Sequence, residues 1–98
     1  MSGRRIGPRA AGVLETEIGD DISLYHPMSE TVAVLNSTAS DVWRLCDGGQ
    51  TLEEIVAALA GAYGVRHIDI ADEVAGVVEG LVAQGFLLST HQQGGAPV

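Results

Sequence analysis

The stretch TVAVLNSTASDVWRLC, residues 31–46, contains the change of pattern that decides the fold. Its first five residues, Thr31 to Leu35, are uncharged and rich in β-branched side chains, which favours an extended strand. The apolar residues that follow recur at helical spacing: Ala39, Val42, Trp43 and Cys46. The hydrophobic period therefore changes from that of a strand to that of a helix near Asn36, and it divides the chain into a sheet half and a helix half.

Two more strands are predicted before this stretch. Residues 13–18 and 22–26 alternate apolar and polar side chains, and Gly19-Asp20-Asp21 between them has the composition of a tight turn. Pro27-Met28-Ser29-Glu30 predicts a second turn, because proline presets the backbone dihedral and the other residues tolerate solvent. We expect a three-stranded antiparallel meander.

Three helices are predicted after the meander. The first begins at Asn36-Ser37 and stops before Gly48-Gly49, and the second opens with the capping box Thr51-Leu52-Glu53-Glu54 and ends at Gly64. Asp69 is expected to cap the third, which continues to Gly85. The apolar residues Phe86-Leu87-Leu88 should then pack back on the body.

The ends of the chain lack apolar periodicity. We expect residues 1–12 to form a flexible N-terminal tail, residues 13–88 to form the folded domain, and residues 89–98 to form a flexible C-terminal tail. A single core is expected for a chain of 98 residues.

The charge balance disfavours a nucleic-acid partner. Thirteen Asp and Glu face only five Arg and no Lys, which gives a formal net charge of −8. Arg4, Arg5 and Arg9 lie in the expected tail, so the predicted body offers only Arg44 and Arg66 to phosphates.

The sequence also predicts no membrane span. The longest uncharged apolar run, Ile55 to Val65, is too short to cross a bilayer. Cys46 is a lone cysteine and can form no intramolecular disulfide, which favours a cytoplasmic location.

No pattern of catalytic or metal-binding residues is present. His26, His67 and His91 lie far apart, and Cys46 falls in an apolar helical stripe, where a buried thiol is favoured over a nucleophile. Trp43 lies in the same stripe and is expected to anchor the core. We therefore predict a protein that is not an enzyme, with no catalytic residue, no metal and no cofactor.

Several motifs, in their order and spacing, resemble a known family. They are Leu24-Tyr25, Pro27, Leu35-Asn36-Ser37-Thr38-Ala39, Val42-Trp43-Arg44-Leu45-Cys46-Asp47-Gly48, Thr51-Leu52-Glu53-Glu54-Ile55, Leu81 and Gly85-Phe86-Leu87. The chain resembles the PqqD family over residues 13–88. These are the pyrroloquinoline quinone biosynthesis D proteins and their relatives, also called RiPP recognition elements. The resemblance implies an α+β, winged helix-turn-helix-like fold with a three-stranded antiparallel sheet followed by three helices.

The resemblance also implies a function and a site. Members of the family bind the leader of a ribosomally made precursor peptide and deliver it to a modifying enzyme, such as a radical SAM protein or a peptidase. The leader adds as a strand beside the third strand, in a groove walled by the third helix. Carried onto this sequence, the peptide-binding residues are Thr31, Val32, Ala33, Val34 and Leu35 on the strand, and Val74, Val77, Val78 and Leu81 on the helix. Of the helix residues, Val77 and Leu81 are expected to face the groove.

Two alternatives stay open at this point. A winged-helix arrangement is also that of DNA-binding regulators, although the third helix would begin among Asp69, Asp72 and Glu73. An acidic carrier protein is the second, because the residues from Asp47 to Leu52 distantly resemble a phosphopantetheine attachment motif, with Thr51 in place of the serine.

Overall fold

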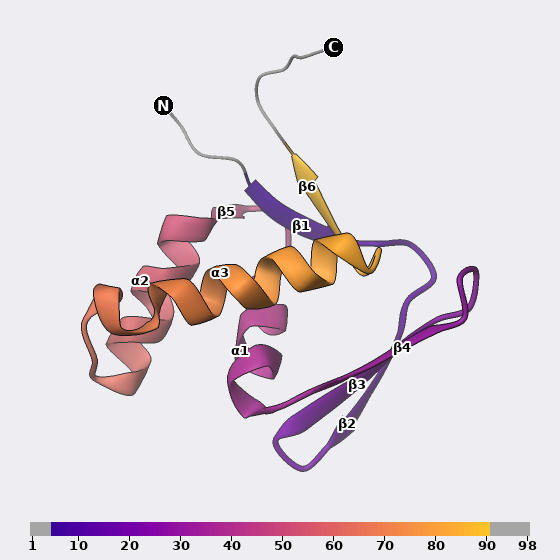
Figure 1. Ribbon diagram of the computed structural model, residues 1–98, viewed down its shortest axis with the longest axis horizontal. Helices are drawn as coiled ribbons and strands as arrows, with labels where there is room; N and C mark the ends of the chain where they lie inside the picture. Colours follow the sequence, from indigo (N-terminus) through magenta and orange to yellow (C-terminus); the bar gives the residue numbers. More distant parts are fainter. Residues whose placement is uncertain (1–4, 91–98) are drawn as a thin grey trace.

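A computed structural model describes residues 5–90 (Figure 1). In chain order the elements are β1 (Arg5–Arg9), β2 (Leu14–Ile18), β3 (Asp21–His26), β4 (Thr31–Leu35), α1 (Ser37–Leu45), β5 (Gln50–Thr51), α2 (Leu52–Tyr63), α3 (His67–Ala83) and β6 (Leu87–Thr90). In Figure 1, α3 crosses the middle of the molecule, and the β2–β4 sheet extends away from it to the lower right. Among residues 5–90, no helix has the combination of length and apolar character that a membrane span requires.

The predicted meander is confirmed. Its strand order is β2-β3-β4, and both pairs are antiparallel. The turn between β2 and β3 needs Gly19, whose φ of 63° is unfavourable for residues with a Cβ. The α+β class with this sheet and three helices is therefore confirmed.

The first two helices begin as the sequence predicts. The Asn36 side chain accepts a hydrogen bond from the Ala39 amide at 2.9 Å, and Thr51 and Glu54 form the capping box of α2. Gly64 ends α2 in the left-handed conformation, with φ of 71°.

The start of α3 was predicted too late. The helix begins at His67, and Asp69 lies inside its first turn, where it accepts a hydrogen bond from the Arg66 amide at 3.1 Å. The carboxylate thus caps the helix from within, and its hydrogen bonds from Arg66 lower the pKa of Asp69. An acidic residue is favourable both at the N-cap and inside the first turn of a helix, so the sequence alone does not decide where α3 begins.

The expected N-terminal tail is wrong over residues 5–9. These residues form β1, the central strand of a second small sheet of order β5-β1-β6, and Ile6 is fully buried. Gly7 permits close approach, since a Cβ there would lie 2.6 Å from the Cys46 carbonyl oxygen. The Arg9 guanidinium donates to the Trp43 carbonyl at 3.0 Å. A strand with one buried apolar side chain shows no hydrophobic alternation in the sequence. Contacts with distant parts of the chain therefore decide that residues 5–9 form a strand.

The other end of the chain also differs from the expected boundary. Phe86 and Leu87 are buried, as predicted, whereas Leu88 is 52% exposed, contrary to the prediction. Leu87–Thr90 forms strand β6, which pairs with β1, so side chains alternate between its two faces. Residues 1–4 and 91–98 of the two expected tails lie outside the described residues.

One core joins the two sheets and the three helices. Trp43 and Phe86 are its largest fully buried side chains, and the Trp43 indole donates to a Glu15 carboxylate oxygen at 2.9 Å. Trp43 is thus the predicted anchor. Cys46 is also fully buried, and burial raises the pKa of its thiol to about 12, so the thiol stays protonated at neutral pH.

Candidate functional site

Strand β4 is an edge strand. Within residues 5–90 it pairs with β3 on one side, and no described strand pairs with its other side. It contains no charged residue, proline or bulge of the kind that commonly protects a sheet edge. The backbone groups on that side are therefore available to another strand.

The register identifies which backbone groups point outward. The two-residue turn makes Ile18 and Asp21 a hydrogen-bonded pair, and hydrogen-bonded and non-hydrogen-bonded pairs alternate along an antiparallel ladder. Ile22, Leu24 and His26 then direct their backbone groups to β4, opposite Leu35, Ala33 and Thr31. We infer that Val32 and Val34 direct their amides and carbonyls away from the sheet.

A groove of about 320 Å³ lies between this strand and α3. Its lining residues come from β4, α1 and α3: Ala33, Val34, Leu35, Ala39, Gly76, Val77, Gly80, Leu81 and Gln84. None of them is charged. The groove therefore combines apolar walls with an adjoining strand edge.

Two glycines leave part of the α3 side of the groove without side chains. Gly76 and Gly80 are one helical turn apart, and a Cβ at either position would meet no other atom within 4 Å. Glycine within a helix costs about 1 kcal/mol relative to alanine, so two in one helix are a signal that sequence analysis can use. The sequence prediction of the wall did not include them, nor Ala39 and Gln84.

The structure separates the predicted site residues into three groups. Ala33, Val34, Leu35, Val77 and Leu81 line the groove, whereas Thr31 and Val32 belong to the edge strand without lining it. Val74 and Val78 are fully buried in the core and face away from the groove. The apolar stripe of α3 thus packs inward, and only one margin of it reaches the groove.

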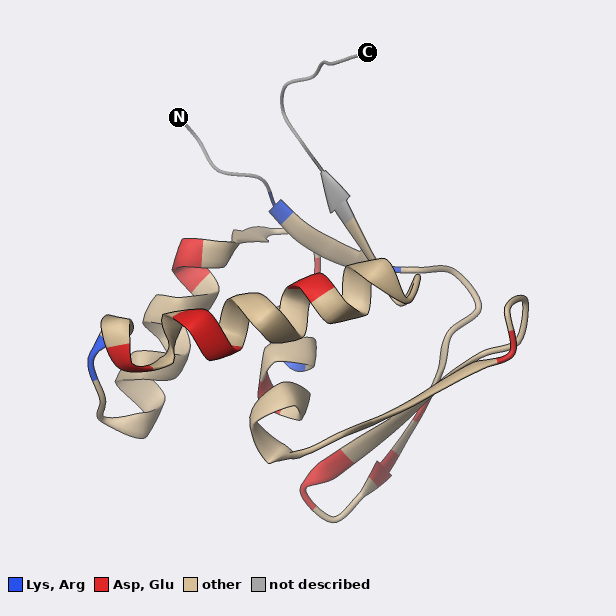
Figure 2. Ribbon diagram, in the orientation of Figure 1, with Lys and Arg blue, Asp and Glu red and all other residues tan. Residues whose placement is uncertain are grey.

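Acidic residues lie around the groove and not in it. Asp69, Asp72 and Glu73 occupy the first half of α3, and Figure 2 shows further acids at the turns of the meander. A ligand in the groove therefore meets apolar walls first and negative charge near the ends.

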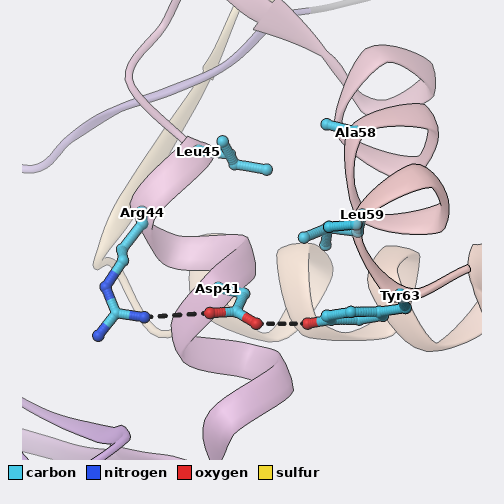
Figure 3. A pocket seen from close by; sticks show the side chains of 7 residues that line it. Asp41, Arg44, Leu45, Ala58, Leu59 and Tyr63 are labelled. Atoms are coloured by element: carbon cyan, nitrogen blue, oxygen red, sulfur yellow. Dashed lines mark hydrogen bonds and ion pairs between the residues drawn. The ribbon is translucent and has the colours of Figure 1, made fainter.

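A second hollow lies between α1 and α2, and its polar side chains bond to one another (Figure 3). There the Asp41 carboxylate accepts hydrogen bonds from Arg44, at 3.1 Å, and from the Tyr63 hydroxyl. Desolvation, and then the hydrogen bond to Asp41, raises the pKa of Tyr63 to about 12. The neutral hydroxyl and the carboxylate connect the two helices across a hollow whose other lining is mostly aliphatic.

The fold and the groove define a small domain of three-stranded sheet and three helices, with an open strand edge beside the last helix. Residues 21–87 match the model of the family described as coenzyme PQQ synthesis protein D (PqqD), and the chain belongs to this family. The resemblance noted in the sequence is thereby confirmed.

A solved structure supports the same assignment. The structure described as TbiB1 in complex with the TbiA(beta) leader peptide superposes with a TM-score of 0.71 and 25% sequence identity. The match covers 81% of this chain and 92% of that one. No curated protein matches the sequence.

Proposed function

We propose that this protein binds the leader segment of a ribosomally made precursor peptide and presents it to a modifying enzyme. The observation that carries the proposal is the uncharged groove beside the open edge of β4. The similarity to a chain solved with a leader peptide gives independent support.

The leader adds as a strand along β4. Val32 and Val34 each supply one outward donor and one outward acceptor, and each hydrogen bond contributes about 0.5–1.5 kcal/mol net. Such bonds are independent of sequence, so the side chain that enters the groove supplies specificity. A fully buried aliphatic side chain adds about 1.5–3 kcal/mol. The predicted ligand is an extended peptide with a large apolar residue facing α3.

DNA binding is not favoured by the arrangement of charge. The first turns of α3, which would approach a DNA groove in a winged-helix protein, contain Asp69, Asp72 and Glu73. Carboxylates at these positions repel the phosphate backbone.

A carrier function is not favoured either. The Thr51 hydroxyl, at the position where a carrier holds its attachment serine, accepts a hydrogen bond from the Glu54 amide at 3.2 Å. Its role as the cap of α2 accounts for this residue without a modification.

We further propose that the protein acts without catalysing a reaction itself. The thiol of Cys46 is buried, and within residues 5–90 no three His, Cys, Asp or Glu side chains are grouped so that they could hold a metal ion. The modifying enzyme, a radical SAM protein, a peptidase or a similar enzyme, supplies the chemistry. A reduced lone cysteine is consistent with a cytoplasmic location.

The test begins with a search of the gene neighbourhood for a short precursor peptide, whose leader is then tested for binding by fluorescence anisotropy. We expect micromolar or tighter affinity for the wild type. Val34→Pro removes an amide that points to the ligand and not to β3, and its ring also distorts the edge that the leader must follow. Together these changes should abolish binding while circular dichroism shows an intact fold. Val34→Ala keeps that amide and should keep the binding. Unchanged affinity of a folded Val34→Pro variant would contradict the proposed site.

A further inference from the structure

The meander has a second apolar face, opposite the one that packs on the helices. Side chains alternate between faces along each strand, and the register aligns Leu14, Tyr25 and Val32 in one row across β2, β3 and β4. Their exposed fractions are 57%, 38% and 60%. Ile18 and Val34 lie on the same side, with exposed fractions of 62% and 70%. We call these five residues the outer face.

Exposed apolar side chains are concentrated on this face. Ten large hydrophobic side chains are exposed among residues 5–90, and six of them belong to the meander or its second turn. These six are the outer face and Met28. On the inner side, Ile22 and Leu24 are fully buried. Thr16, Asp21 and Ser23 lie on the same side as the outer face, so five of the eight side chains on that side are apolar. A largely apolar, exposed sheet side opposite a covered one indicates an interaction surface.

The charge around the outer face argues against a second copy of this protein as its occupant. Residues 14–35 contain no Lys or Arg. Asp20 and Glu30 lie at the two turns that bound the face, and Asp21, opposite Ile18, lies at its margin (Figure 2). Two copies, each with a formal net charge of −8, would bring these acids together. The complementary partner has an apolar centre and a basic rim.

The outer face is continuous with the edge where a peptide would add. Val32 and Val34 direct their backbone groups to that edge and expose their side chains on the outer face. In an added strand, alternate side chains enter the groove and the others extend the outer face beside these two valines. A protein that covers the outer face therefore touches the bound peptide as well.

We propose that the outer face is the docking surface for the enzyme that modifies the bound peptide. This inference rests on the proposed function, because the enzyme is the partner that must contact both this protein and its bound peptide. The enzyme's docking surface is apolar at its centre, facing Leu14 and Tyr25, and carries Lys or Arg opposite the two acidic turns. A bound peptide extends the outer face, so the enzyme should bind the peptide complex more tightly than the free protein.

The experiment uses Leu14→Arg, with Ile68→Arg as the matched control. Leu14 lies on β2, two strands from the peptide edge, and Ile68 is an equally apolar residue on α3, 76% exposed and outside the outer face. The probe is the purified maturation enzyme identified in the same gene neighbourhood as the precursor, titrated by calorimetry into the full chain saturated with leader peptide. Leader affinity is measured separately by fluorescence anisotropy.

We expect Leu14→Arg to weaken enzyme binding at least about tenfold and to leave leader affinity unchanged. Ile68→Arg should alter neither. Enzyme binding to the wild type should also weaken with added salt, and more strongly than leader binding, because the groove itself contains no charged residue.

Three results would overturn the inference: no enzyme binding by the loaded wild type, an unchanged enzyme affinity in Leu14→Arg, or an equal loss in Ile68→Arg. Self-association of the wild type that Leu14→Arg abolishes would identify a second copy as the occupant and would also overturn it. Failure of the wild type to bind leader would refute the proposed function instead, so the two failures are distinguishable.

Discussion

Replacing Gly80 should make the protein more stable and, with a large side chain, should weaken its binding of the leader peptide. Gly80 lies within α3, and a Cβ there would meet no other atom within 4 Å. Gly80→Ala therefore gains helix propensity without a clash, about 0.8–1.0 kcal/mol. For a domain of this size, each kcal/mol raises Tm by about 4–8 °C.

Gly80→Leu should keep most of that stability but block the groove. A leucine at this position leans toward the preceding turn, over Gly76, and occupies the 320 Å³ that a peptide side chain would fill. Loss of one buried aliphatic side chain from the complex costs about 1.5–3 kcal/mol, which corresponds to roughly tenfold to hundredfold weaker binding.

Differential scanning calorimetry and fluorescence anisotropy with the leader peptide measure the two effects. Gly61, inside α2 and equally free of neighbours, gives the matched controls Gly61→Ala and Gly61→Leu. These should raise Tm and leave peptide binding unchanged. Wild-type affinity in a stabilised Gly80→Leu variant would refute the assignment of the groove as the peptide site.

Three further outcomes are expected. Ile6→Ala should lower the free energy of unfolding by about 2–5 kcal/mol in urea titration, because β1 belongs to the core, and a negligible change would restore the tail interpretation. Thr51→Ala should cost about 0.5–2 kcal/mol through loss of the α2 cap, and Thr51→Ser, which keeps the hydroxyl, should recover most of it in the same titration. Stability should fall as pH rises above about 9, because the unfolded chain ionises Cys46 and Tyr63 at ordinary pKa values of 9.0 and 10.0 while the folded pKa of each is about 12. Thermal melts of Cys46→Ala with Tyr63→Phe should show a flatter pH profile, and an unchanged profile would contradict this account.

The sequence predicted the elements whose signal is local. The period change at Asn36, the capping box at Thr51 and Glu54, and the turn at Gly19 each involve neighbouring residues, and each appears in the structure as expected. Strand β1 was missed because its place depends on contacts with residues some forty positions away, such as that between Gly7 and Cys46.

The groove was predictable only in outline. An apolar stripe shows that a helix packs against the body, but not how that helix crosses the sheet. Val74 and Val77 are equally apolar in sequence, yet Val74 is fully buried and Val77 lines the groove. The glycines at positions 76 and 80 indicate which side of α3 faces the groove, because helix positions without side chains leave space that a ligand can occupy.

The pairing of β1 with β6 brings the two ends of the described chain together. Arg5 lies opposite Thr90, on the side of the molecule away from the β2–β4 sheet (Figure 1). A short linker could join these ends, and the chain could be reopened after Gly64, which would give a circular permutant with an undisturbed groove. The same geometry makes this fold suited to insertion within a longer polypeptide, which would enter and leave the domain at neighbouring points.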